Sequence, residues 1–90
     1  EIEVETTNII QVEEALAAEA DIIMLDNMTP SKMKEAVGLI GSRAKTEASG
    51  NITVNNVREV AETGVDYISV GALTHSVRAF DISQKLEKLI

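Results

Sequence analysis

The chain repeats itself with an offset of 45 residues. The segment Val12–Ile23 aligns with Val57–Ile68, and both copies pass from a helical apolar pattern into a short apolar run. Two strand–helix units fit within this offset, so the chain has room for four. Such alternation predicts parallel strands joined by helical crossovers. The sequence therefore favours an α/β fold, either a small open sheet or part of a (β/α) barrel.

Local signals place the expected strands and helices. The expected strands cover residues 1–5, 21–25, 45–49 and 67–70, and the third of these is the most polar. The expected helices begin at Asn8, near Pro30, at Thr53 and at Asp81. Gly64 is expected to end the third helix.

The number of units is about half of what a complete barrel needs. A (β/α)₈ barrel typically takes about 250 residues. The first expected strand starts at Glu1 with no turn or cap before it. We therefore expect one unit over residues 1–90, four parallel strand–helix units forming about half of a TIM-like barrel, cut from a longer chain.

Charge and composition exclude several classes of partner. The net charge of −7 disfavours nucleic-acid binding, which needs clustered Lys and Arg. No apolar run approaches the length of a membrane span, and no signal-peptide pattern opens the chain. The absence of Cys excludes disulfides and fits a reducing compartment. We expect a protein that binds neither nucleic acid nor membrane.

Two carboxylates follow from the strand pattern as candidate site residues. Ligands of parallel α/β folds bind at the carboxyl ends of the strands, where Glu5 and Asp26 are expected. A carboxylate pair there suits an oxocarbenium-like centre, ribose hydroxyls or Mg²⁺. The alternative is that Asp26 and Asn27 cap the helix near Pro30 while Glu5 is simply exposed.

The last two expected strands are followed by candidate phosphate loops. Ser49-Gly50-Asn51 and the segment Gly71–Thr74 combine small residues with close backbone approach. In barrels, the loops after the last two strands often bind phosphate. The lone histidine, His75, suits a phosphate contact or a proton shuttle. The alternatives are an ordinary turn for Ser49–Asn51 and an exposed loop position for His75.

Three segments together resemble the quinolinate phosphoribosyltransferase family, also called carboxylating nicotinate-nucleotide pyrophosphorylase. These segments are Ala20–Met28, Glu47–Thr53 and Glu62–Ser76. The resemblance covers essentially the whole chain and matches the C-terminal part of that enzyme. It implies a partly open α/β barrel in a two-domain, cytosolic, dimeric or higher homo-oligomeric enzyme. It also implies a step of NAD biosynthesis that converts quinolinate and phosphoribosyl pyrophosphate, with Mg²⁺, to nicotinate mononucleotide, pyrophosphate and CO₂.

The resemblance assigns roles to individual positions. Glu5 and Asp26 fall on the family's acidic pair, which faces the ribosyl ring and its metal-bound pyrophosphate. The positions that fall on its phosphate-binding residues are Ser49, Gly50, Asn51, Gly71 and His75. Glu3 is the alternative to Glu5, because the segment 6–10 is less typical of the family.

The cations for quinolinate are not assigned. Arg43, Lys45 and Arg78 are the only basic residues expected near loops, and in the family the quinolinate-binding cations come largely from earlier segments and the partner subunit. We therefore expect the isolated chain to be inactive. Two alternatives remain open: a non-catalytic phosphate-binding half-barrel and a purely structural module.

Overall fold

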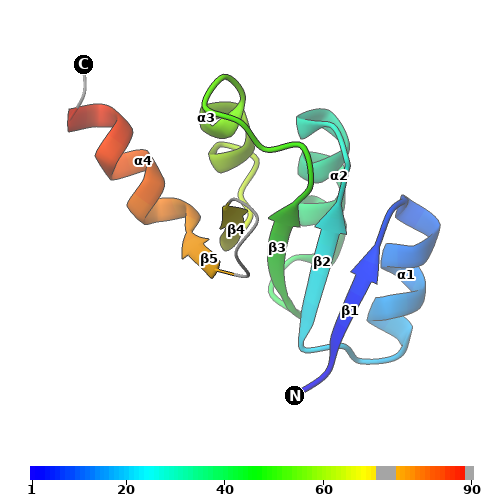
Figure 1. The fold of residues 1–90 in the computed structure, drawn as a ribbon. Coiled ribbons are helices and arrows are strands. Elements are labelled where there is room, and N and C mark those ends of the chain that lie inside the picture. Colours follow the sequence, from blue (N-terminus) through cyan, green and yellow to red (C-terminus); the bar gives the residue numbers. More distant parts are fainter. Residues whose placement is uncertain (71–74, 89–90) are drawn as a thin grey trace.

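A five-stranded sheet organises the chain (Figure 1). The computed structural model describes residues 1–70 and 75–88. The strands are β1 (Glu3–Thr6), β2 (Ile22–Asp26), β3 (Lys45–Ser49), β4 (Tyr67–Val70) and β5 (His75–Arg78). The helices are α1 (Ile9–Ala17), α2 (Pro30–Ile40), α3 (Val57–Ala61) and α4 (Ala79–Lys88).

The strand order confirms the expected α/β fold. Strands β1 to β4 are parallel and adjacent in chain order, so each helix between them is a crossover. The polar strand β3 forms over the predicted residues, because its Thr46 and Ala48 are buried. Strand β5 was not predicted. It pairs with β4 in the antiparallel direction at the edge of the sheet, so the expectation of an entirely parallel sheet was wrong there.

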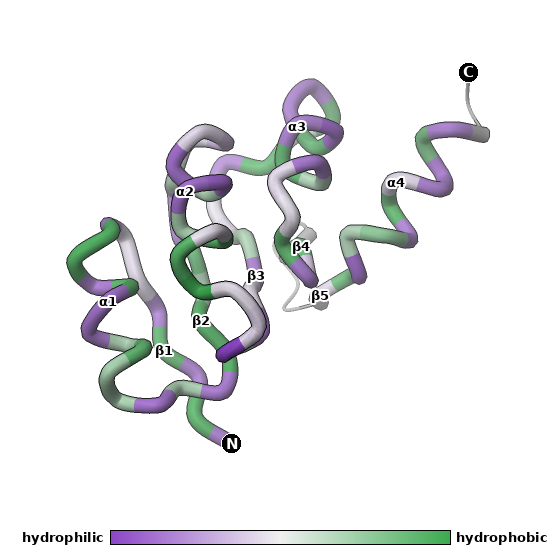
Figure 2. The backbone as a smooth tube through the Cα atoms, turned by 180° about the vertical axis from the view of Figure 1, so that it is seen from behind, coloured by the Kyte–Doolittle hydropathy of each residue, from purple (hydrophilic) through white to green (hydrophobic). Residues whose placement is uncertain are grey.

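The two faces of the sheet differ. Burial alternates along β2: Ile23 and Leu25 are completely buried, whereas Ile22, Met24 and Asp26 are half-buried. Helices α1 and α2 pack behind the sheet, and Figure 2 shows them from their own side, in front of the strands. We call the opposite face, which no helix covers in Figure 1, the open face. By register, Glu5, Asp26, Glu47 and Ser49 share this face with the apolar Met24, whereas the buried Thr6 and Thr46 lie on the covered face.

Two helices begin as the sequence indicates. Asn8 Oδ1 accepts a hydrogen bond from Gln11 N at 2.9 Å, and Gln11 Oε1 accepts one from Thr7 N at 2.7 Å. This reciprocal pair satisfies donors that a helix start leaves unpaired. Thr29 caps α2, with Pro30 in its first turn. The alternative role of Asp26 and Asn27 as caps of α2 is therefore wrong.

The other two helix starts were misplaced. Helix α3 begins at Val57, because a turn held by the Thr53 carbonyl precedes it, so Thr53 does not open it. Helix α4 begins at Ala79, and Asp81 lies in its first turn rather than before it. Both errors come from polar residues that resemble caps in sequence.

The 45-residue repeat has a structural counterpart at the amino ends of the strands. Asp21 Oδ2 accepts a hydrogen bond from Ile2 N at 2.7 Å, and Asp66 Oδ2 accepts one from Thr46 N at 2.9 Å. Each aspartate precedes a strand and joins it to the start of the preceding strand. The repeat therefore fixes the strand register at the edge opposite the expected site.

Candidate active site

Asp26 and Ser49 lie side by side at the carboxyl ends of β2 and β3. They are register partners, and Ser49 Oγ donates a hydrogen bond to Asp26 Oδ1 at 2.9 Å. Both side chains are half-buried and lie on the open face. Asp26 Oδ2 makes no hydrogen bond to the described residues. The carboxylate is therefore held by one oxygen and can contact a ligand with the other.

Gly50 allows this close approach. Its φ of +78° is a conformation that side-chain-bearing residues rarely adopt. A Cβ at this position would lie 2.9 Å from Asp26 Oδ1 and 3.1 Å from Asn27 N. Glycine is therefore required by both the backbone conformation and the space beside the carboxylate.

An amide pair joins the loops after β2 and β3. Asn27 and Asn51 both have positive φ, 59° and 53°, and Asn51 Nδ2 donates a hydrogen bond to Asn27 Oδ1. Asn27 N also donates to Ser49 O at 2.9 Å. The role of Asn27 was missed from the sequence. The usable signal was the placement of Asn, which tolerates positive φ, directly after Asp26 and Gly50.

Backbone donors collect after β3. Among the described residues, the N–H groups of Gly50, Asn51 and Ile52 find no hydrogen-bond acceptor. Asn56 braces the loop, because its Nδ2 donates to Asn51 O and its Oδ1 accepts from Thr53 N, both at 2.8 Å. Successive N–H groups in such a turn form an anion-binding concavity. A cavity of about 240 Å³ adjoins them, lined in part by Gly50, Asn51 and Asn56.

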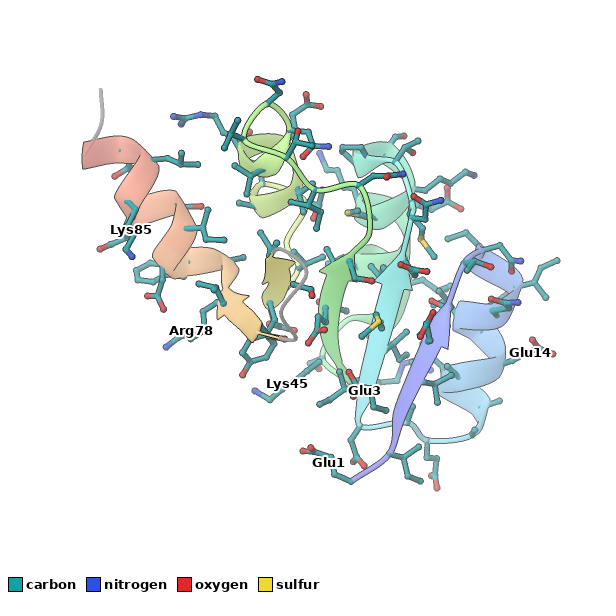
Figure 3. All side chains as sticks on the ribbon, in the orientation of Figure 1. Glu1, Glu3, Glu14, Lys45, Arg78 and Lys85 are labelled. Carbon is teal, nitrogen blue, oxygen red and sulfur yellow. The ribbon has the colours of Figure 1, made fainter. Side chains whose placement is uncertain are left out.

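Glu5 lies on the same face but below the carboxyl end of its strand, and its side chain is exposed, as the alternative interpretation expects. It sits inside β1 rather than at its end, paired with Met24, and Thr6 ends the strand. Glu5 is therefore two residues from the level of Asp26, or about 8 Å between Cα atoms for neighbouring strands. The alternative residue, Glu3, pairs with Ile22, two positions farther away. Glu5 is therefore nearer to Asp26 than Glu3 is. Glu3 is labelled in Figure 3.

Two of the expected phosphate-binding residues lie wholly or partly outside the residues that the structure describes. Gly71 lies outside the described residues, as does the side chain of His75. The backbone of His75 belongs to β5, where it pairs with Val70, so the alternative that places His75 in a loop is wrong.

The basic residues expected near loops lie away from this edge. Lys45 begins β3, and its Nζ lies 5.9 Å from the ring centroid of Tyr67, at the amino end of the strands (Figure 3). Arg43 Nη2 donates to Leu39 O. Lys32, which was not singled out from the sequence, lines a cavity of about 430 Å³ beside Asn27 at the carboxyl edge. Its Nζ pairs with Glu35 at 3.3 Å, and both side chains are exposed.

A protein-family comparison decides the family. The family model described as the C-terminal domain of quinolinate phosphoribosyl transferase matches residues 1–85. The chain belongs to this family. The resemblance based on the three segments is thereby confirmed.

Relatives from plants and bacteria agree with this assignment. The chain is 48% identical to the chloroplastic nicotinate-nucleotide pyrophosphorylase [carboxylating] of Oryza sativa subsp. japonica, over 96% of this chain and 27% of that protein. It is also 48% identical to the probable nicotinate-nucleotide pyrophosphorylase [carboxylating] of Bacillus subtilis, over 92% of this chain and 28% of that protein. The chain thus spans under a third of the length of these relatives of the quinolinate phosphoribosyltransferase family.

Solved structures confirm the fold. The nicotinate-nucleotide pyrophosphorylase from Ehrlichia chaffeensis superposes with a TM-score of 0.76 and 47% identity, over 82% of this chain and 27% of that one. The enzyme from Francisella tularensis gives a TM-score of 0.74 and 44% identity, over 84% of this chain and 28% of that one.

Within the described part of the chain, no helix is long and apolar enough to cross a membrane.

Proposed function

We propose that this chain forms the ribose- and phosphate-facing part of a quinolinate phosphoribosyltransferase active site. The complete enzyme would convert quinolinate and phosphoribosyl pyrophosphate to nicotinate mononucleotide, pyrophosphate and CO₂. The observation that carries the proposal is the position of Asp26: a half-buried carboxylate at the carboxyl edge, directly beside the backbone donors of Gly50 and Asn51. Family membership supplies the reaction.

The carboxylates suit the charge that develops in this reaction. Departure of pyrophosphate places positive charge on the C1–O4 unit of the ribose. Asp26 and Glu5 on the open face would stabilise that charge more than the neutral ground state, which is the condition for lowering the barrier. Asp26 is the better placed of the two, because it is the register partner of Ser49, directly before the loop that carries the backbone donors.

The loop after β3 would fix the other end of the ribose. The N–H groups of Gly50 and Asn51 would bind the 5-phosphate and so orient the ring over the carboxylates. Gly71 and His75 are proposed as further phosphate contacts from family resemblance alone.

The donor set suits Mg²⁺ bound together with its substrate. This ion commonly takes one or two carboxylates plus substrate phosphates, rather than a complete protein cage. Glu5 and Asp26 would supply such carboxylates, and the described ranges contain no group of three or more Asp, Glu, His or Cys residues that could hold a metal ion by themselves. When bound, the ion would neutralise charge on the pyrophosphate.

Binding of quinolinate needs cations in addition to these residues. Quinolinate is a dianion, and of the described basic residues only Lys32 lines a cavity at the carboxyl edge. We propose that other segments of the complete enzyme, in a homo-oligomer, supply the remaining cations.

A cytoplasmic location is also proposed, although some plant relatives are named as chloroplastic or mitochondrial.

The test is an assay of the complete enzyme that contains this chain. Quinolinate and phosphoribosyl pyrophosphate are supplied together, and nicotinate mononucleotide and CO₂ are measured, with each substrate omitted in turn as the control. We expect product only with both substrates. A protein that binds phosphate but forms no product would instead support the alternative of a non-catalytic phosphate-binding module.

A further inference from the structure

The hydroxyl of Ser49 is already committed to a carboxylate. Ser49 Oγ donates to Asp26 Oδ1 at 2.9 Å, and the two residues are register partners. A serine hydroxyl has a single proton to donate. Because phosphate oxygens are acceptors, a proton that is donated to Asp26 is not available to a phosphate. This contact differs from the phosphate-binding role that family resemblance gives to Ser49.

The surroundings restrain the same carboxylate oxygen from a second side. A Cβ atom added to Gly50 would lie 2.9 Å from Asp26 Oδ1, so the Gly50 backbone lies against this oxygen. Backbone hydrogen bonding from Asn27 N to Ser49 O, at 2.9 Å, keeps the two strand ends aligned. Oδ1 is therefore fixed between a donor and the backbone, and Oδ2 makes no hydrogen bond to the described residues.

We propose that Ser49 is a positioning residue that orients the Asp26 carboxylate toward the ribosyl ring. The 5-phosphate is then held by the backbone N–H groups that follow Ser49, and not by its hydroxyl. This inference rests on the proposed function, since it requires Asp26 to face the reacting ribose. Electrostatic stabilisation of a transition state depends on charges that are already oriented, so loss of the orienting hydroxyl affects turnover more than binding.

The test compares Ser49→Ala and Ser49→Thr in the complete enzyme. We expect Ser49→Ala to lower kcat about tenfold, the scale of one hydrogen bond to a charged group, while the dissociation constant of inorganic phosphate changes less than about twofold. Ser49→Thr keeps the hydroxyl and restores most of kcat. Ser69→Ala is the matched control, because Ser69 is a half-buried serine at the next strand, and its hydroxyl makes no hydrogen bond to the described residues.

A double-mutant cycle with Asp26→Ala provides the second readout. If Ser49 acts through Asp26, adding Ser49→Ala to Asp26→Ala lowers kcat no further. An additive loss would overturn the proposal, as would a Ser49→Ala enzyme with normal kcat and tenfold weaker phosphate binding. Wild-type kcat in Asp26→Ala alone would instead refute the proposed function, so the two failures can be told apart.

Discussion

Gly50 lies so close to Asp26 that a side chain at position 50 would contact the carboxylate. The Cβ of an alanine there would be 2.9 Å from Asp26 Oδ1, a separation that real Cβ atoms essentially never show. The same glycine has a φ of +78°. One position thus couples the backbone of the phosphate loop to the orientation of the proposed catalytic carboxylate.

Gly50→Ala is expected to damage both stability and turnover. The positive φ alone costs about 1–2 kcal/mol for a residue with a Cβ, and displacement of the carboxylate lowers kcat. Thermal unfolding and steady-state kinetics of the complete enzyme measure the two effects.

Gly38→Ala is the matched control for this prediction. Gly38 lies in α2, and a Cβ there would meet nothing within 4 Å. Because alanine is favoured over glycine inside a helix, the free energy of unfolding of this variant should rise by about 0.5–1 kcal/mol, and its kcat should stay unchanged. Equal behaviour of the two variants would contradict the role given to Gly50.

Loss of the cap on α1 should lower stability without changing the site. Asn8→Ala removes the hydrogen bond to Gln11 N and should cost about 1 kcal/mol in the free energy of unfolding. Denaturant unfolding measures this value. Asn55→Ala, at an exposed turn position, is the control, and its unfolding midpoint should match that of the parent protein. A loss of the same size in both variants would show that the cap is not the cause.

The isolated chain is expected to bind phosphate weakly. Local backbone donors favour the anion, while the net charge of −7 opposes it. A dissociation constant in the millimolar range is therefore expected, which corresponds to a binding free energy of about −4 kcal/mol. In an amide-shift titration with inorganic phosphate, the signals of Gly50 and Asn51 should move together. The signal of Gly41, at the opposite edge, is the control, and movement of Gly41 alone would place the anion elsewhere.

Much of the fold was predictable because its determinants are local. The apolar run of β2, the Asn8–Gln11 pair and Pro30 each act within a few residues of the element that they define. The 45-residue repeat added the parallel order. Strand β5 was not predictable in this way, because it forms by pairing with β4 and its own residues alternate only weakly.

Three positions of the candidate site were predictable, whereas the level of Glu5 in the sheet and the contacts of the site were not. Asp26, Ser49 and Gly50 follow from the rule that ligands bind at the carboxyl ends of parallel strands. The Ser49–Asp26 hydrogen bond and the Asn27–Asn51 pair depend on the register between strands, which no local pattern specifies.

The proposed catalytic role of Asp26 and Glu5 is tested by the kcat of their variants in the complete enzyme. We expect Asp26→Ala and Glu5→Ala each to lower kcat by about 10²–10³, the usual cost of one well-placed electrostatic group, with much smaller changes in phosphate binding. Glu3→Ala tests the alternative assignment on the same strand, and Glu14→Ala, exposed on α1 (Figure 3), is the control. Both should keep kcat near that of the parent enzyme. Wild-type kcat in Asp26→Ala would refute the catalytic role of this carboxylate and leave Asp26 with a structural role only.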